Sequence, residues 1–361
     1  MHERVPRIAR EVVQRNPDYP PAVRDGIERL AASIESNARL PTVSAPGPDV
    51  EDWLADCREH AGETWLDTEW FFAELLFYRV LRHVCRFWET GRDPFTPAKE
   101  EELAGDALWQ RLDAALGAFG PPAARLEALL SASLWGNRVD LSYAVAAHHG
   151  GEQLDDDLLA DDRPVIAARL LASRDVHLVA DNTGTELALD LALVDALLDG
   201  TRRVTVHVKV EPVFVSDAMA ADVWRLASAM SGRGRDAAAL AGRLRRAFDE
   251  GSFRLAPDPF WTSPRFLWRA PPHLRSTFAA ADIVVFKGDA NYRRVVGDGL
   301  WPEGRTFAEG CDGLGFPLAC LRTLKSDSVV GLPRGTSARL DAVDPKWRIN
   351  GRRGVIQASL R

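Results

Sequence analysis

The sequence predicts an α/β fold: a helical N-terminal region followed by a Rossmann-like α/β/α domain with a mostly parallel sheet. Through the first 150 residues, apolar residues recur at three- and four-residue spacing, as they do in amphipathic helices. Beyond that point, short runs rich in β-branched residues alternate with helical patterns, which is typical of a parallel sheet covered by helices. The polar, acidic stretch HHGGEQLDDDLLADDRP (148–164) separates the two regions. We therefore expect a helical domain over residues 1–155 and an α/β domain over residues 156–361.

The helical region is divided by clusters of proline and glycine at PTVSAPGPD, TGRDPFTP and FGPP. In its aromatic-rich stretch, we expect Phe71, Leu75 and Phe87 to belong to the core. The expected helices cover residues 21–34, 67–90 and 107–133.

The second region contains several strand-like runs, and a helical pattern follows each of the runs at 176–180 and 204–210. The run PLACLRTLK (317–325) leads to a further strand end. The other expected strands are VHLVA (176–180), VTVHVKV (204–210), IVVFKGD (283–289) and VVGL (329–332).

Composition excludes several classes of protein. The chain has 361 residues, 46% of them hydrophobic and 27% charged, and a net charge of -7, which argues against a nucleic-acid partner. Apolar runs stay below the roughly 18 residues that a membrane span requires, and the N-terminal stretch lacks the apolar segment of a secretory signal. The four cysteines show no CxxC spacing. We expect a cytoplasmic protein without a membrane partner, and these features predict no oligomeric state.

Polar residues follow the ends of the expected strands. In open α/β sheets, ligands bind beyond the carboxyl ends of the strands, so these residues are candidates for one site. Asp181 and Asn182 follow the first strand, and Asp217 follows the second. The later strands end in a further set of polar residues, which comprises Lys287, Asp289, Asn291, Tyr292, Arg293, Arg322, Thr323 and Lys325.

The chemistry of these residues points to a metal beside a phosphoryl group. Asp181, Asn182 and Asp217 offer the oxygen ligands that hard cations prefer. Basic side chains next to a metal suit a phosphoryl group. A helix that begins near residue 182 would add backbone N–H groups and the positive end of its dipole, which also stabilise an anion. An alternative stays open, because Asp or Asn before an apolar helix is commonly a cap.

Lysine is rare in this chain, since only 5 of its 45 basic residues are lysine. Where lysine persists among arginines, the position can require a compact ammonium group. Lys209, Lys287 and Lys325 lie in or beside apolar strand-like runs. With five lysines in all, chance is the alternative explanation.

Several blocks of the sequence resemble the metal-dependent damage-control phosphatases, in the branch named for acidic residue methyltransferase. The blocks are LWGNRVDLS, DNTGTELALDL, VSDA, FKGDANYRR, LRTLKSDSVVGL and WRINGRRGVIQ, together with the aromatic helix WFFAELLFYR. They span about residues 65–357, and their order and combination carry the resemblance. Ala290 departs from the larger apolar residue usual in the family, which should affect packing.

The resemblance implies a metal-dependent phosphatase acting on small phosphorylated metabolites, such as fructose 1-phosphate or fructose 6-phosphate. It implies that Asp181, Asn182 and Asp217 bind a divalent metal (Mn, Co, Ni or Mg), and that Lys325 binds the substrate phosphate. Other implied substrate-binding residues are Asp289, Asn291, Tyr292, Arg293, Arg322, Asn137 and Asp140, the last two in a less definite role.

The mechanism that these residues favour is direct attack by water, because no Ser, Cys or His is an evident nucleophile. Asp217 or Glu186 is a candidate base, and Glu186 could equally support the site. Two other functions compete: S-adenosylmethionine-dependent carboxyl methylation and non-catalytic sugar-phosphate binding. We find no G-x-G-x-x-G after a first strand, and an activated metal site is unnecessary for a binding protein, so we favour the phosphatase.

Overall fold

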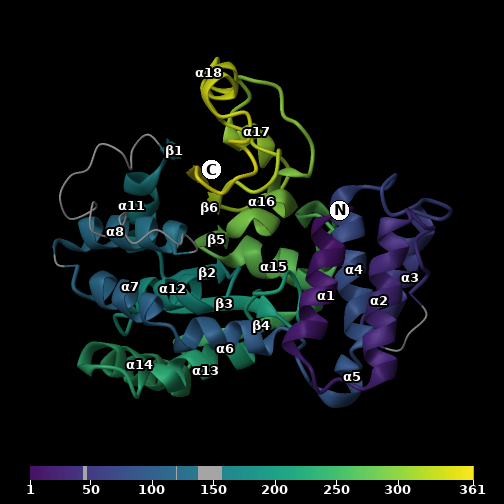
Figure 1. Ribbon diagram of the computed structural model, residues 1–361. Helices are drawn as coiled ribbons and strands as arrows, with labels where there is room; N and C mark the ends of the chain where they lie inside the picture. Colours follow the sequence, from purple (N-terminus) through teal and green to yellow (C-terminus); the bar gives the residue numbers. More distant parts are fainter. Residues whose placement is uncertain (44–46, 119, 137–156, 361) are drawn as a thin grey trace. The chain divides into compact units, whose positions relative to one another are not determined.

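The computed structural model describes residues 1–43, 47–118, 120–136 and 157–360 (Figure 1). The chain forms two compact units, and the first consists of three separate segments: Met1–Glu102, Lys209–Met219 and Asp258–Pro264. The second unit comprises Leu103–Val208, Ala220–Pro257 and Arg265–Arg361.

The first unit is helical. The helices α1 and α2 pack on each other, and both contact α4. Phe71 and Leu75 on α4 are fully buried, as expected, whereas Phe87 is half-buried. Arg4 on α1 and Glu74 on α4 form an ion pair with an N–O distance of 2.9 Å. The helices of this unit are α1 (Arg4–Arg15), α2 (Pro21–Glu35), α3 (Val50–Glu59), α4 (Trp70–Val84), α5 (Phe87–Thr90) and most of α6 (Thr96–Ala104).

A seven-stranded sheet with the order β1-β7-β6-β5-β2-β3-β4 forms the centre of the second unit. The pairs β1–β7, β2–β3, β2–β5 and β5–β6 are parallel, and β6–β7 is antiparallel. The mostly parallel sheet that the sequence predicted is therefore confirmed. The strands are β1 (Leu158–Asp161), β2 (Asp175–Val179), β3 (Arg203–Lys209), β4 (Phe253–Asp258), β5 (Ile283–Lys287), β6 (Leu318–Thr323) and β7 (Gly354–Ser359).

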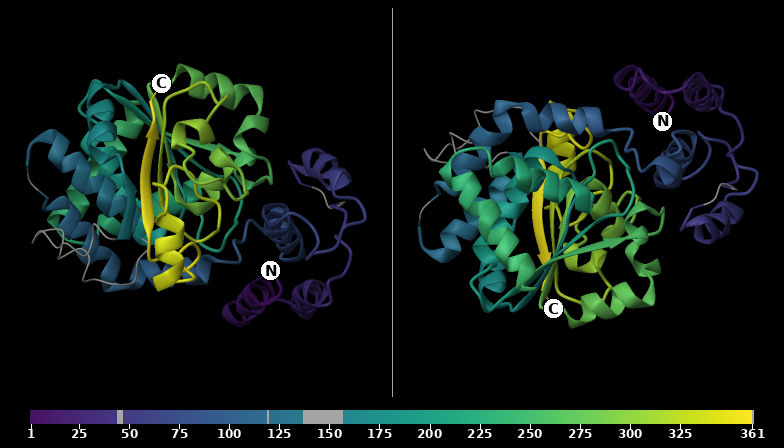
Figure 2. Two further views of the ribbon diagram at one scale, coloured as in Figure 1. Left: turned by 90° about the horizontal axis from the view of Figure 1, so that it is seen from above. Right: turned by 90° about the horizontal axis from the view of Figure 1, so that it is seen from below.

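Helices cover both faces of this sheet, as Figure 2 shows for α8, α11 and α12 on one face and α15 and α16 on the other. The helix α12 is buried around nearly its whole circumference, as expected for a helix with apolar residues on all sides. The helices are α7 (Asp106–Leu116), α8 (Pro122–Trp135), α11 (Arg163–Ala172), α12 (Gly184–Leu197), α13 (Ala220–Met230), α14 (Arg235–Asp249), α15 (Pro272–Ala280), α16 (Gly288–Val296), α17 (Phe307–Gly310) and α18 (Thr336–Val343).

The units divide the chain at other points than the boundary expected near residue 155. The reason is that α7 and α8 pack against α12 and so belong to the unit that contains the sheet. Apolar periodicity identifies these segments as helices but carries no information about which partner buries them. The expected helix at 107–133 is also two helices, because the FGPP cluster interrupts it.

The expected strand VVGL (329–332) is wrong. Residues 329–332 form no strand, and the backbone oxygen of Val330 accepts hydrogen bonds from Tyr292 Oη (3.3 Å) and Gln357 Nε2 (2.8 Å). Gly331 has a φ of +82°, which a strand does not allow. The other four expected strand runs are confirmed as β2, β3, β5 and β6.

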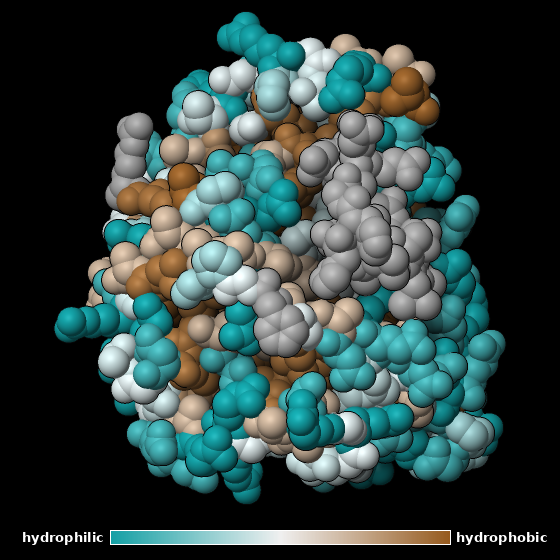
Figure 3. Space-filling view, turned by 90° about the vertical axis from the view of Figure 1, so that its left-hand side faces the viewer, coloured by the Kyte–Doolittle hydropathy of each residue, from teal (hydrophilic) through white to brown (hydrophobic). Residues whose placement is uncertain are grey.

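Throughout the described ranges, every helix is too short or too polar to cross a membrane. On the face of the molecule shown in Figure 3, hydrophilic residues surround smaller areas of apolar ones.

Candidate functional site

The strand order of the sheet reverses between β2 and β5. From β2 the chain passes through α12 to β3 on one side, and from β5 it passes through α16 to β6 on the other. The two strands are parallel neighbours, and Val179 pairs with Phe286 near their carboxyl ends. At such a reversal the helices diverge and leave a crevice in which ligands bind. Asp181 and Asn182 follow β2 at this edge, and Gly288 and Asp289 follow β5.

Gly288 lies directly against the carboxylate of Asp181. A Cβ atom on Gly288 would be 1.9 Å from Asp181 Oδ2 and 2.1 Å from its Cγ. Gly288 also has a φ of +84°, in the left-handed region that favours glycine. The backbone at the start of α16 can therefore approach Asp181 closely only because this residue has no side chain. The glycine directly after the strand is the one signal in the sequence that could have identified this contact.

Asn182 is held by two carboxylates. Its Nδ2 atom donates to Asp181 Oδ2 at 2.8 Å and to Glu186 Oε2 at 2.9 Å. The N-cap of α12 is Thr183, whose side chain makes no capping hydrogen bond, and the helix begins at Gly184. The capping alternative is thus wrong for this pair, and α12 begins two residues later than the expected start at residue 182.

Beneath Asn182, a lysine and two carboxylates form a buried network. Lys287 Nζ donates to Glu186 Oε1 at 2.9 Å and to the backbone oxygen of Ser133 at 2.9 Å, and it lies 3.0 Å from Asp190 Oδ1. Ser133 Oγ donates to the same Asp190 oxygen at 2.5 Å. The lysine is 0% exposed, so it is engaged inside the unit rather than facing a phosphoryl group as the sequence had suggested.

The network shifts the pKa values of its members in different directions. Burial raises the pKa of Glu186, but Lys287 and the hydrogen bond from Asn182 outweigh burial and lower this pKa overall. Burial raises the pKa of Asp190 to about 6, although Lys287 opposes the shift. Burial lowers the pKa of Lys287, but the two carboxylates outweigh burial and raise it overall. Glu186 is therefore a stably ionised acceptor between Lys287 and Asn182.

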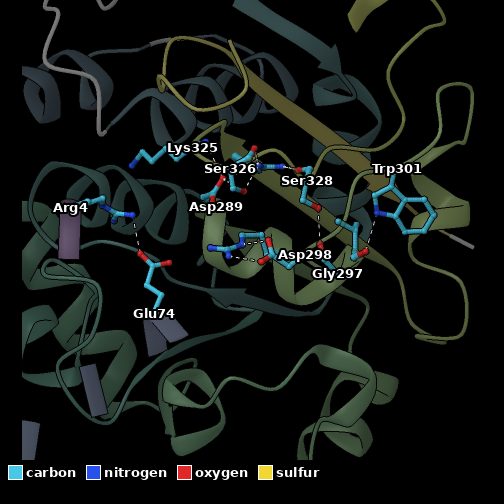
Figure 4. Close-up of polar contacts among 12 residues, drawn as sticks. Arg4, Glu74, Asp289, Gly297, Asp298, Trp301, Lys325, Ser326 and Ser328 are labelled. Carbon is cyan, nitrogen blue, oxygen red and sulfur yellow. Dashed lines mark hydrogen bonds and ion pairs between the residues drawn. The ribbon is translucent and has the colours of Figure 1, made fainter. Parts of the chain in front are cut away.

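Asp289 holds the chain around Lys325. Its Oδ1 atom accepts from Arg322 Nε (2.8 Å), from the backbone nitrogen of Lys325 (3.0 Å) and from Ser326 Oγ (3.1 Å). Figure 4 shows Asp289 beside Lys325 and Ser326. Burial raises the pKa of Asp289, and the nearby Arg322 and Arg293 outweigh burial and lower it. Lys325 itself is exposed.

The arginines of this region are bound to their own surroundings. Arg322 is fully buried, donates to the backbone oxygens of Ser326 and Ser328, and lies over the Tyr292 ring at 4.4 Å. Arg293 forms a two-bond ion pair with Asp298 at 2.6 and 2.7 Å. Of the four cations named from strand ends, Lys287, Arg293 and Arg322 are buried and Lys325 is exposed.

Asn291 joins the carboxyl ends of β2 and β5. Its Nδ2 donates to the backbone oxygens of Ala180 (3.2 Å) and Lys287 (2.8 Å). The Oδ1 atom is buried and has no hydrogen-bond partner within the described residues. The neighbouring Tyr292 is also buried and donates from its hydroxyl to Gln357 Oε1 at 3.1 Å.

Asp217 lies in the first unit, where it is 1% exposed. Lys209 Nζ lies 2.9 Å from Asp217 Oδ2, and Lys99 Nζ donates to the backbone oxygen of Asp217 at 3.1 Å. Lys99 is also paired with Asp93 at 2.9 Å. The lysine bias indicated Lys209 as a special position, but Lys99 gave no signal, because it occurs in a polar stretch of sequence.

The backbone just before Asp217 is strained. Phe214 and Val215 have φ values of 49° and 70°, although neither is a glycine. For a β-branched residue such as valine this conformation is an outlier, and such strain concentrates at functional sites. The loop is tied to α4 by Arg82, which pairs with Glu211 at 3.1 Å and donates to the Pro212 oxygen at 3.2 Å.

The structure thus places the predicted acids and amides among its described residues in two groups. Asp181, Asn182, Asp289 and Asn291 gather at the edge of β2 and β5, and Asp217 belongs to the first unit. Asn137 and Asp140 lie outside the described residues.

The donors at the β2–β5 edge fit a hard divalent cation. Asp181 and Asn182 present a carboxylate and an amide oxygen, and Gly288 leaves the backbone close beside the carboxylate. Within the described ranges, no group of three or more His, Cys, Asp or Glu side chains is placed to hold a metal ion. The four cysteines are free thiols.

Comparisons with known proteins identify the family of this chain. A family model, the damage-control phosphatase ARMT1-like domain, matches residues 1–340. The chain is similar to the damage-control phosphatase ARMT1 of Danio rerio, with 32% identity over 64% of this chain and 57% of that protein. It is also similar to that of Xenopus laevis, with 29% identity over 82% of this chain and 77% of that protein. The matched region therefore spans little more than half of the Danio rerio protein.

A solved structure supports the fold. The crystal structure of a DUF89 family protein from Pyrococcus horikoshii aligns with a TM-score of 0.50, over 90% of each chain and with 14% identity. At that identity the likeness concerns the fold. The family model covers most of the chain, and we conclude that the chain belongs to the damage-control phosphatase ARMT1-like domain family.

Proposed function

We propose that this protein is a divalent-metal-dependent phosphatase of small phosphorylated metabolites. The observation that carries the proposal is the position of Asp181 and Asn182 at the reversal of strand order, with Asp181 packed against Gly288. An acid and an amide in this crevice favour a hard cation, and the names of the relatives indicate phosphatases.

Asp181 and Asn182 would hold the metal, which we propose to be Mn, Co, Ni or Mg, and we retain Asp217 as the third ligand that the resemblance implies. When bound, such an ion polarises a phosphoryl oxygen and lowers the pKa of a bound water. The chain's own part is to hold these oxygen ligands in a fixed orientation. Buried hydrogen bonds such as those from Asn182 to Asp181 and Glu186 serve this purpose.

Lys325 would neutralise charge on the phosphoryl group of the substrate. It is exposed, and its backbone is fixed by the Asp289 carboxylate, so its ammonium group extends from a held loop. We propose that the substrate is a sugar phosphate such as fructose 1-phosphate or fructose 6-phosphate. The remaining substrate contacts that the resemblance implies are Asp289, Asn291, Tyr292, Arg293, Arg322, Asn137 and Asp140.

The burial of several of these residues suggests how they contribute. Tyr292 and Arg293 are bound to Gln357 and Asp298, so we propose that they shape the pocket through these contacts. Asn291 has a buried Oδ1 atom next to the Ala180 backbone, and this oxygen is the group with which it would contact a ligand. The free thiols fit a reducing compartment, and we place the activity in the cytoplasm.

A phosphate-release screen tests the proposal. Purified protein is expected to release phosphate from sugar phosphates with added Mn²⁺, Co²⁺, Ni²⁺ or Mg²⁺ and to lose this activity in a chelator. No release from any phosphate monoester with any of these metals would overturn the proposal. Saturable S-adenosylmethionine binding without phosphate release would favour methyl transfer instead.

Lys325→Ala is expected to lower kcat/KM about 10- to 100-fold, because a hydrogen bond to a charged group contributes roughly 1.5–3 kcal/mol. Lys346→Ala, which removes another exposed lysine, is the control and should leave kcat/KM unchanged. Equal activities of the two variants would exclude Lys325 from substrate binding.

A further inference from the structure

We propose that Glu186 and Lys287 are positioning residues that fix the side-chain amide of Asn182 with its oxygen, rather than its nitrogen, facing the ligand. The inference rests on the proposed metal site. It assigns a specific task to a buried pair that does not itself touch the metal or the substrate.

The orientation of the Asn182 amide is the first step in the argument. An amide has one end that donates and one that accepts, and only the oxygen end can ligate a hard cation. Nδ2 of Asn182 is directed at Asp181 Oδ2 (2.8 Å) and at Glu186 Oε2 (2.9 Å), and both are acceptors. Two carboxylates on one side therefore select the nitrogen for that side and turn Oδ1 the other way.

Glu186 can select the nitrogen only while its Oε2 atom is held in place as an acceptor. Lys287 meets this requirement, because its Nζ donates to Oε1 at 2.9 Å while Oε2 faces Asn182. Glu186 and Lys287 are both buried, so water cannot replace either partner. Each oxygen of Glu186 thus has its own donor, and the pair acts as a rigid support for the amide.

Asp190 provides a natural comparison within the same network. It lies 3.0 Å from Lys287 Nζ and accepts from Ser133 Oγ at 2.5 Å. It is an acid that is as deeply buried as Glu186, and its hydrogen bond and ion pair are with Ser133 and Lys287. A substitution at Asp190 changes the charge of the network without changing what the Asn182 amide faces.

The Glu186→Gln variant tests whether the orientation of the Asn182 amide determines metal binding. Glutamine has one oxygen, and the Lys287 ammonium is expected to take it, which leaves the glutamine NH2 group facing Nδ2 of Asn182. Two donors cannot pair, so the Asn182 amide loses one of the two acceptors that hold its nitrogen, and its oxygen is no longer fixed toward the ligand. The measurement is the Kd for Mn²⁺ by titration calorimetry on full-length, metal-free protein, and we expect at least a tenfold weakening.

Exchanging the acid and the amide between positions 182 and 186 makes the test specific for the orientation of the amide. In Asn182→Asp, Glu186 faces a second carboxylate, whereas in Asn182→Asp/Glu186→Gln the glutamine NH2 group donates to the new carboxylate. Glu186→Gln should therefore weaken Mn²⁺ binding when residue 182 is Asn and strengthen it when residue 182 is Asp. A general loss of structure cannot produce this reversal of sign, so it identifies orientation as the cause.

Asp190→Asn is the matched control and should change the Kd for Mn²⁺ less than threefold. Equal weakening in Asp190→Asn and Glu186→Gln, or additive effects in the double variant, would overturn the inference. So would a Glu186→Gln protein that binds Mn²⁺ like the wild type, and that result leaves the proposed phosphatase intact. Absence of Mn²⁺ binding by the wild type itself would instead overturn the proposed function and this inference together.

Discussion

Gly288→Ala is expected to abolish phosphate release. The new Cβ atom would lie 1.9 Å from Asp181 Oδ2, well inside van der Waals contact, and the same oxygen accepts a hydrogen bond from Asn182 Nδ2. Either Asp181 or the start of α16 must move by about an ångström, and a misplacement of that size in an active site costs roughly 10²-fold in rate. We therefore expect kcat/KM to fall at least about 10²-fold, together with weaker Mn²⁺ binding in calorimetry.

Gly313→Ala is the control for backbone strain. Gly313 has a φ of +82°, almost the same as Gly288, but a Cβ atom there would meet nothing within 4 Å. Both variants therefore carry a similar conformational cost, and only one meets Asp181. If Gly313→Ala lost as much activity as Gly288→Ala, the close contact with Asp181 would not be the cause.

Lys287→Met is expected to destabilise the fold by about 3–5 kcal/mol, the usual cost of removing one partner from a buried ion pair. Methionine preserves most of the side-chain volume but leaves the carboxylates of Glu186 and Asp190 buried without a positive charge. The free energy of unfolding from urea denaturation measures this effect.

A second variant tests whether uncompensated charge causes the loss of stability in Lys287→Met. Lys287→Met/Asp190→Asn removes one of the two uncompensated charges and should recover part of the lost stability. Lys346→Met, at an exposed position, should change the free energy of unfolding by less than about 0.5 kcal/mol. A Lys287→Met protein as stable as the wild type would show that the network is not needed for folding.

The sequence was informative where periodicity and local chemistry act together. Alternation of strands and helices predicted the sheet, and polar residues after β2 and β5 predicted the edge at which Asp181 and Asp289 lie. The strand order was not predictable, because hydrophobic runs do not specify which neighbours pair. The reversal of strand order between β2 and β5 therefore became visible only in three dimensions.

The partners of individual side chains also could not be predicted from the sequence. Lys287 and Arg322 stand at strand ends, where a basic residue suggests anion binding, but folding brings Glu186 and Asp289 to them. Those contacts join positions about 100 and 33 residues apart, which spacing arguments do not reach. Similarly, Asp181 and Asn182 resemble helix caps in sequence. Only the structure, in which Thr183 is the N-cap of α12, distinguishes a capping role from a ligand-binding role for this pair.

The most direct test of the proposed function is the Mn²⁺-dependent release of phosphate from fructose 1-phosphate by Asp181→Ala, measured beside the wild type and Asp312→Ala. Asp312 is exposed, so its variant controls for loss of one acidic side chain. We predict metal-dependent release by the wild type and Asp312→Ala, and at least about a 10²-fold loss in Asp181→Ala, since a metal contributes several kcal/mol of charge stabilisation. Full activity of folded Asp181→Ala at every Mn²⁺ concentration would contradict a metal-dependent phosphatase site at the β2–β5 edge.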